Sequence, residues 1–301
     1  MVLSEKEKRA IEKVPTADVQ AYDCYLRGRK FFHQFRRKGF ELARQMFSRA
    51  IEIDHKYARA YAGIADCCSF LYMYWDPSGE ANLEQADAAS QKALELDSEL
   101  AEAHASRGLV VSLKKKYEEA KQEFTIAMQM DPKLFEASYF LARNYYAQGK
   151  LAEAVKWFEE ASRVRPEDYQ APMLLASAYH GLGRKAKAEV AYRQGFAAAQ
   201  KHLELHPEDA RALYLGANAL SQLGERERCL EWAGRALAME SEEPQVLYNV
   251  ACVYALLGER DKAIDCLEKS VTHAPLMEAW MRHDPDLASL RNHPRLQRLI
   301  K

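Results

Sequence analysis

Three short stretches of this 301-residue sequence combine residue types that could do chemistry. DCC (66–68) places a carboxylate beside two thiols, a combination used in redox and metal sites. HLELH (202–206) puts two imidazoles four residues apart, a spacing that can hold zinc on one face of a helix. RGRKFFHQFRRKGF (27–40) contains six Lys or Arg residues and no acid, so it could attract an anionic partner.

The two adjacent thiols are predicted to be packing residues. Neighbouring residues of a helix point about 100° apart, so Cys67 and Cys68 cannot readily chelate one ion or bridge to each other. None of the six cysteines forms a C-x-x-C pair, and six are too few for a disulfide framework in a chain of this length. We therefore expect reduced, buried thiols and a cytoplasmic protein.

The histidine pair and the glycines also favour a structural interpretation. HLELH lacks the H-E-x-x-H order, and His206 stands directly before Pro207, where a helix would end. The sequence has no G-x-x-x-x-G-K-[ST], G-x-G-x-x-G or G-x-S-x-G motif. We predict no enzymatic activity, no metal, no cofactor and no small-molecule substrate.

Charge and hydropathy narrow the class of partner. Lys and Arg total 43 against 44 Asp and Glu, so no overall field favours nucleic acid or an acidic membrane. The longest apolar run, residues 61–75, is interrupted by Asp66 and is too short to span a bilayer. The basic run 27–40 has two interpretations: the solvated outer face of the first helices, or a docking patch for an acidic partner that includes Arg36 and Arg37.

The elements that position these residues follow from a repeat. Segments 102–132 and 136–166 align at an offset of 34, which matches Gly108 with Ala142, Phe124 with Phe158 and Pro132 with Pro166. The same frame extends in both directions, with ends near residues 55, 98, 132, 166, 207, 241 and 275. Two repeats are longer than 34 residues, by 9 and by 7.

This pattern resembles the tetratricopeptide repeat, a helix–turn–helix unit of 34 residues. The resemblance implies an all-α, right-handed α-solenoid of about seven repeats with capping helices at both ends. In such a fold, small residues lie where two helices cross and aromatic side chains fill the holes between repeats. The implied segments are a lead-in and N-terminal cap (1–21), repeats 22–57, 58–100, 101–134, 135–168, 169–209, 210–243 and 244–277, and a C-terminal cap (278–301).

The opening PTADVQAYDCYLRGR and the closing WMRHDPDLASLRNHPRLQRL resemble the repeat arrays of bacterial signalling proteins. In those proteins the arrays accompany an adenylate cyclase, a Ser/Thr kinase or a transcriptional regulator. Two functions follow from the resemblance. One is a free-standing scaffold for protein–protein interaction. The other is a regulatory or sensory module whose catalytic or DNA-binding domain is on another chain or missing.

The resemblance also implies a binding site, because the concave groove of such arrays is lined by the first helix of each repeat. Large aromatic and arginine side chains, the usual hot spots of interfaces, recur at those positions. We expect a protein or peptide partner there, with self-association as a second option. A clamp for an acidic chaperone tail fits less well, since Tyr214 stands where the first lysine belongs. The predicted groove residues are Tyr139, Arg143, Tyr146, His180, Arg211, Tyr214, Asn218 and Tyr248.

The aromatic run after Cys68 is predicted to prolong the first helix of the second repeat. Residues 70–75 lead into the 9-residue insertion. Two outcomes are open: residues 72–75 pack in part on a 3-residue extension of the first repeat, or they form an exposed apolar ledge. In the second case Tyr72, Tyr74 and Trp75, with Arg36 and Arg37, would be a secondary partner surface.

Overall fold

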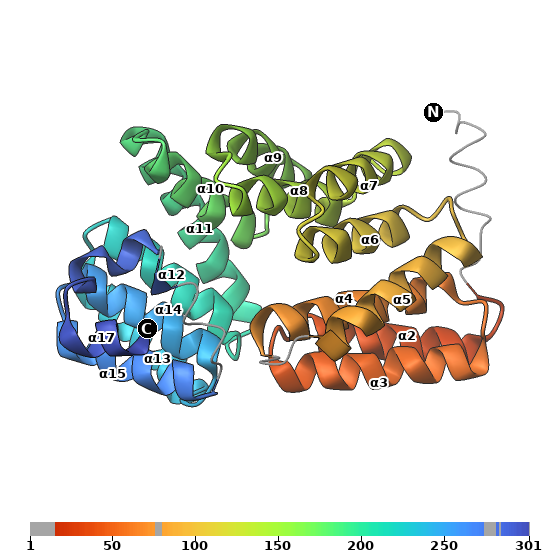
Figure 1. The fold of residues 1–301 in the computed structure, drawn as a ribbon, viewed down its shortest axis with the longest axis horizontal. Coiled ribbons are helices and arrows are strands. Elements are labelled where there is room, and N and C mark those ends of the chain that lie inside the picture. The colour runs from red at the N-terminus through yellow and green to blue at the C-terminus, as the bar shows by residue number, and fades with distance from the viewer. Residues whose placement is uncertain (1–15, 76–79, 274–280, 283, 301) are drawn as a thin grey trace. The chain divides into compact units, whose positions relative to one another are not determined.

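A computed structural model describes residues 16–75, 80–273, 281–282 and 284–300. Within these residues the chain is all-α and contains no strand (Figure 1). No helix in the described part is long and apolar enough to cross a membrane. Most of the predicted N-terminal cap (residues 1–15) and the predicted repeat end near residue 275 lie outside the described residues.

Seven consecutive helix pairs run from Val19 to His273, consistent with the seven predicted repeats. We call the first helix of each pair the A helix and the second the B helix. The pairs are α2 (Val19–Phe32) with α3 (Arg37–Ile53), α4 (Ala58–Tyr74) with α5 (Glu80–Leu96), α6 (Ala101–Leu113) with α7 (Tyr117–Met130), α8 (Phe135–Ala147) with α9 (Leu151–Val164), α10 (Gln170–Gly181) with α11 (Lys185–Leu205), α12 (Ala210–Gln222) with α13 (Arg226–Met239), and α14 (Pro244–Leu256) with α15 (Arg260–His273).

The turns inside the later pairs require glycine. Gly149, Gly183, Gly224 and Gly258 all have φ between +71° and +79°, the left-handed conformation that other residues adopt only with strain. At each of these turns the chain reverses after the A helix, and the next residues begin the B helix. These four glycines therefore have a structural role, as the sequence analysis proposed for the glycines of the chain.

A matched pair of substitutions in α12–α13 tests this assignment. Gly224→Ala is expected to lower the free energy of unfolding by about 1 kcal/mol, because alanine is strained at φ +77°. Gly234→Ala is expected to raise it by about 0.5–1 kcal/mol, because Gly234 lies inside α13 and an added Cβ meets nothing within 4 Å. Urea unfolding followed by circular dichroism measures both, and the same sign for the two variants would contradict the assignment.

Aromatic side chains of B helices pack directly on glycines of A helices. A Cβ added to Gly108 would lie 2.6 Å from the Phe124 ring, and one added to Gly216 would lie 2.3 Å from the Trp232 ring. Such distances leave room only for hydrogen at these glycines. In these two pairs a glycine of the A helix thus packs against an aromatic ring of the B helix, the kind of contact that the resemblance implies.

The chain divides into two compact units. The first unit comprises residues 1–72 and 80–137, and the second comprises residues 73–79 and 138–301. The last residues of α4, Met73 and Tyr74, therefore belong to the second unit, together with Trp75. This division separates the two candidate sites described below.

The two insertions lengthen helices. α4 has 17 residues, whereas α6, α8, α12 and α14 have 13 each, so the predicted prolongation of this A helix is confirmed. α11 has 21 residues, against 14 in the B helices α9 and α13. The extra turns of α4 and α11 extend beyond the repeat frame.

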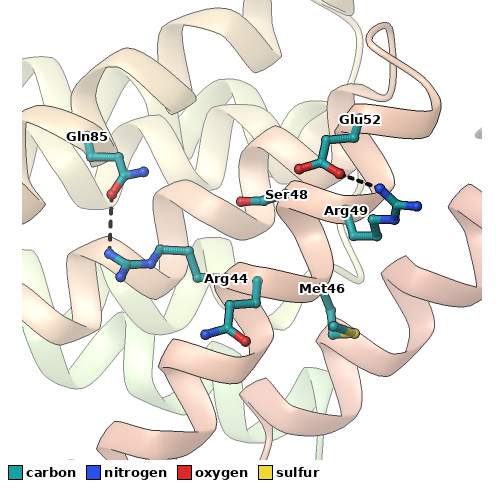
Figure 2. A pocket seen from close by; sticks show the side chains of 7 residues that line it. Arg44, Met46, Ser48, Arg49, Glu52 and Gln85 are labelled. Atoms are coloured by element: carbon teal, nitrogen blue, oxygen red, sulfur yellow. Dashed lines mark hydrogen bonds and ion pairs between the residues drawn. The ribbon is translucent and has the colours of Figure 1, made fainter.

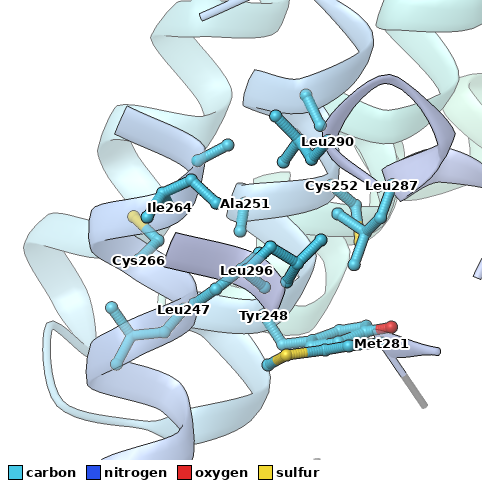
Figure 3. Packing of buried hydrophobic residues seen from close by; sticks show 13 residues of the cluster. Leu247, Tyr248, Ala251, Cys252, Ile264, Cys266, Met281, Leu287, Leu290 and Leu296 are labelled. Carbon is cyan, nitrogen blue, oxygen red and sulfur yellow. The ribbon is translucent and has the colours of Figure 1, made fainter. Parts of the chain in front are cut away.

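The described C-terminal residues pack on the last helix pair, as expected of a cap. A short 3-10 helix, η1 (Pro285–Leu290), and α17 (Pro294–Leu299) follow α15. Their buried leucines join a cluster with residues of α14 and α15 (Figure 3). Leu287, Leu290 and Leu296 have no exposed surface, so this end of the array buries apolar area that would otherwise face water.

Candidate protein-binding surface

The eight predicted groove residues all lie on A helices of the second unit, and we call the surface that they form the A-helix face. Tyr139, Arg143 and Tyr146 are on α8, His180 is on α10, Arg211, Tyr214 and Asn218 are on α12, and Tyr248 is on α14. The helical repeat explains this grouping, because residues three or four apart share one face of a helix.

These eight side chains differ greatly in exposure. Tyr139, Tyr214 and Tyr248 are buried, with 3–4% of their surface exposed, and Arg211 is 9% exposed. Tyr146 is 36% exposed, and His180 is also exposed. Part of the A-helix face is therefore covered by other residues of the same unit, and part is open to solvent.

The end of α4 covers Arg143. The Arg143 Nη2 atom donates to the Tyr74 hydroxyl at 2.9 Å and lies 2.9 Å from the Met73 sulfur. The guanidinium also stands over two tyrosine rings, 6.0 Å from the centre of Tyr74 and 5.8 Å from that of Tyr139. Its Nη1 atom is buried and has no hydrogen-bond partner among the described residues.

A second buried arginine reaches the same tyrosine. Arg211 donates from Nε to the Gln170 side-chain oxygen at 2.9 Å and from Nη1 to the Tyr214 hydroxyl at 3.0 Å. Burial alone would raise the pKa of Tyr74, but Arg143 and Arg211, which both hydrogen-bond to its hydroxyl, lower that pKa below its ordinary value. The Tyr74 hydroxyl thus serves as an acceptor for two guanidinium groups.

Trp75 is held beside Tyr74 by a different helix pair. Its indole Nε1 donates to the Glu243 side-chain oxygen at 2.6 Å, and its ring meets that of Tyr74 edge-on at 5.6 Å. Tyr74 is 6% exposed and Trp75 is 7% exposed. The alternative of an exposed apolar ledge is therefore wrong for these two residues, because the second unit provides both apolar cover and hydrogen-bond partners for them.

Phe70, at the start of the aromatic run, packs on the first helix pair, whereas Tyr74 and Trp75 bond to residues of the second unit. Phe70 stacks on Phe40 with ring centres 5.2 Å apart and meets Phe32 and Phe35 edge-on. These residues belong to the first helix pair and its connection, where the first repeat is extended. Tyr72 is partly buried, whereas Arg36 and Arg37 are exposed and interact with Gln34 and Glu41 respectively.

The C-terminal cap covers the other end of the A-helix face. The Tyr248 hydroxyl donates to Asp284 at 2.6 Å, and Asn218 donates to Asp286 at 3.1 Å. Burial, with Asp284 nearby, raises the pKa of Asp286 to about 6, although the Asn218 hydrogen bond acts in the opposite direction. The sequence analysis missed these contacts, since Asp284 and Asp286 lie outside the repeat frame.

Cys252, Asp284 and Asp286 form the only described group of three side chains close enough together to share a metal ion, with ligand atoms within 4.8 Å. Their atoms are already used in hydrogen bonds. One oxygen of Asp284 accepts from Tyr248 and from the Cys252 thiol at 3.7 Å, and the other accepts from the backbone of Asp286. We assign this group to holding η1 against α14.

The first unit contains a buried carboxylate that was not anticipated. Asp66 lies on α4, and burial raises its pKa to about 7, although a hydrogen bond from Ser106 and the charge of Arg29 act in the opposite direction. Its Oδ1 atom has no hydrogen-bond partner among the described residues. The thiols that follow, Cys67 and Cys68, are fully buried, and burial raises the pKa of both, as expected of packing residues.

A hollow of about 710 Å³ lies along α3 in the first unit (Figure 2). Its charged side chains are already paired: Arg44 donates to Gln85 at 3.3 Å, and Arg49 donates to Glu52 at 2.6 Å. Both arginines point along the helix surface and not toward a common centre. We assign no ligand to this hollow.

Comparison with known families and structures identifies the repeat. Two tetratricopeptide-repeat models match the chain, one over residues 113–168 and the other over residues 170–202 and 244–275. The structure is similar to that of yeast Tom70, with a TM-score of 0.52 and 18% identity over 95% of this chain and 68% of Tom70. It is also similar to PilW, a type IV pilus biogenesis factor, with a TM-score of 0.50 and 17% identity over 74% of this chain and 94% of PilW.

The chain thus contains tetratricopeptide repeats arranged as an α-solenoid. Such repeats imply a protein–protein interaction scaffold and are generally not catalytic. A curated relative, putative adenylate cyclase 3 of Rhizobium meliloti (strain 1021), is 29% identical over 122 residues. That match covers 40% of this chain and spans only a fifth of the relative's length.

Proposed function

We propose that this tetratricopeptide-repeat chain is a non-catalytic scaffold that holds a segment of a partner protein on the A-helix face. The observation that carries the proposal is that the A-helix face already holds two aromatic residues from outside the repeat frame. Tyr74 and Trp75 are fixed there by hydrogen bonds from Arg143 and to Glu243, at 2.9 and 2.6 Å. A surface that binds side chains in this way has the chemistry needed to bind those of a peptide.

The open part of the A-helix face is where a partner would make first contact. Tyr146 and His180 are exposed on α8 and α10. A tyrosine supplies large contact area with little conformational entropy to lose, which is why tyrosines are frequent hot spots. Arg143 and Tyr214 are already engaged in hydrogen bonds within the chain, so they are poor choices for a first test of partner contact.

The proposal is tested by affinity purification of the wild-type chain and the double variant Tyr146→Ala/His180→Ala from the native host. A partner recovered with the wild type is expected to fall about tenfold or more with the variant, since loss of a hot-spot tyrosine costs about 2 kcal/mol. The matched control is Val190→Ala/Leu205→Ala, which removes two exposed apolar side chains from the B helix α11, 57% and 78% exposed. Undiminished recovery with the first variant, or equal loss with the control, would show that the partner binds elsewhere.

A second candidate function is regulation of a signalling enzyme. The similarity of 122 residues of this chain to a putative adenylate cyclase is the observation that favours it. In that case the recovered partner would be a nucleotide cyclase, a kinase or a DNA-binding regulator. Recovery of unrelated partners would favour the general scaffold.

We place the scaffold in the cytoplasm, with a protein, a peptide or a second copy of the chain as its partner. The cysteines support this location. All six are free thiols, and those at 67, 68, 229, 252 and 266 are buried. Unpaired thiols are typical of a reducing compartment.

A further inference from the structure

The Tyr74–Trp75 segment contacts the A-helix face as a bound peptide would. It reaches helices far away in sequence: 69 residues separate Tyr74 from Arg143, and 168 separate Trp75 from Glu243. It offers an aromatic ring to a guanidinium, a hydroxyl to two arginines and an indole N–H to a carboxylate. These are the interactions by which peptide side chains are recognised at protein surfaces.

The segment is present because α4 overruns the repeat. A-helices of 13 residues build this fold elsewhere in the chain, so the 17 residues of α4 exceed what one repeat needs. Met73, Tyr74 and Trp75 at the end of this run form part of the second unit.

The Tyr74 hydroxyl is not the strongest acceptor that Arg143 and Arg211 could bind. A phenol hydroxyl is a neutral acceptor, and a guanidinium binds more strongly to a charged or bidentate one. Among the described residues, the buried Arg143 Nη1 atom has no hydrogen-bond partner, which is unfavourable. The segment therefore fills the site but does not pair every guanidinium donor with an acceptor. A segment of another protein that offers stronger acceptors could displace it.

We propose that Tyr74 and Trp75 are an internal ligand that occupies the partner site on the A-helix face and must leave before a partner segment can bind there. This inference rests on the proposed function. A tethered segment acts at an effective concentration on the order of millimolar, so it would exclude weak partners and admit only those that bind more tightly. Partner selection would then be set by an intramolecular competition.

The test uses the segment itself as the probe. The probe is a fluorescein-labelled peptide of residues 70–80 with added N-terminal lysines for solubility, titrated by fluorescence anisotropy into the full-length chain. We expect the Tyr74→Ser/Trp75→Ser variant to bind it at least tenfold more tightly than the wild type, whose site is occupied. Adding Arg143→Met to that variant is expected to weaken binding at least tenfold. A peptide with serine in place of Tyr74 and Trp75 is expected not to bind.

Three results would overturn the inference: equal affinity for wild type and variant, no binding to the variant, or binding that Arg143→Met leaves unchanged. Circular dichroism and thermal melting check that each variant is folded. If the serine variant is not, Tyr74→Phe/Trp75→Phe replaces it, since it keeps an aromatic ring at each position and removes both polar bonds; a smaller gain in affinity over the wild type is then expected. Failure of the peptide test while partner recovery still depends on Tyr146 and His180 would reject only the internal ligand, whereas the reverse pattern would reject only the proposed function.

Discussion

Replacing Asp66 with asparagine is expected to raise the free energy of unfolding at pH 8 by on the order of 3 kcal/mol. Burial raises the pKa of Asp66 from its ordinary value near 4 to about 7 in the folded chain. Each unit of that difference corresponds to about 1.4 kcal/mol. Asparagine has nearly the same shape and can still accept a hydrogen bond from Ser106, but it carries no charge into the interior.

The sign of the pH dependence follows from the same shift. The folded state holds the Asp66 proton more tightly than the unfolded state, so protonated Asp66 adds to the free energy of unfolding. This contribution is fully present below about pH 4 and is lost as the pH rises through about 7. Urea unfolding at pH 5 and pH 8 should therefore show a loss of stability in the wild type that is largely absent from Asp66→Asn.

Asp87 provides the control with the opposite sign. Burial acts to raise its pKa, but hydrogen bonds from Lys114 and Arg107 outweigh burial and lower it below the ordinary value. Asp87→Asn is expected to cost about 1.5–3 kcal/mol at pH 8, because it removes a charged acceptor of these hydrogen bonds. An Asp66→Asn variant that is less stable than the wild type at pH 8, or that retains the wild-type pH profile, would contradict the burial argument.

The repeat architecture could be predicted from the sequence because its determinants are local and periodic. The positive φ of Gly183 and Gly224 follows from one turn of fixed geometry in each helix pair. The contact of Phe124 with Gly108 follows from the spacing of a small and an aromatic position in one repeat. Each such feature recurs every 34 residues, so the same residue pattern can be recognised in several repeats.

The covering of the A-helix face could not be predicted, because it depends on segments that break the period. Tyr74 and Trp75 come from an insertion, and Asp284 comes from the cap. Helical spacing places Arg143 and Tyr248 on the right face of their helices, but it contains no information on which distant segment lies against them. The sequence thus indicated the candidate surface and left open what covers it.

The two covering segments use complementary chemistry. Near α8 the face presents Arg143 and receives neutral aromatic side chains, whereas near α14 it presents Tyr248 and receives the carboxylate of Asp284. The segment at the cap is anchored by buried leucines, which makes it part of the fold. The α4 overrun contributes no residue to that leucine cluster, so we assign displacement to the overrun and a permanent place in the fold to the cap.

Truncating Phe47 to alanine is expected to destabilise the first unit by about 3–5 kcal/mol, the usual cost of deleting a fully buried aromatic side chain. The ring lies between two A helices. A Cβ on Gly28 would be 2.5 Å from one edge of the Phe47 ring, and a Cβ on Gly63 would be 2.7 Å from the other. Tyr25 contacts the same ring, with centres 5.6 Å apart. Phe47 therefore joins α2, α3 and α4 at one point, and its loss leaves a cavity that three helices would have to close.

The pairing of this ring with glycine is tested by a double-mutant cycle. Gly63→Ala alone is expected to cost about 1–3 kcal/mol, because its new methyl group would collide with the Phe47 ring. Combined with Phe47→Leu, which vacates that space, the same methyl should cost much less, giving a coupling energy of about 1 kcal/mol or more by urea unfolding. Additive costs in the double variant would mean that ring and glycine do not share a contact. That result would contradict the packing assigned to the first unit, in which Gly28 of α2 and Gly63 of α4 both lie against the Phe47 ring.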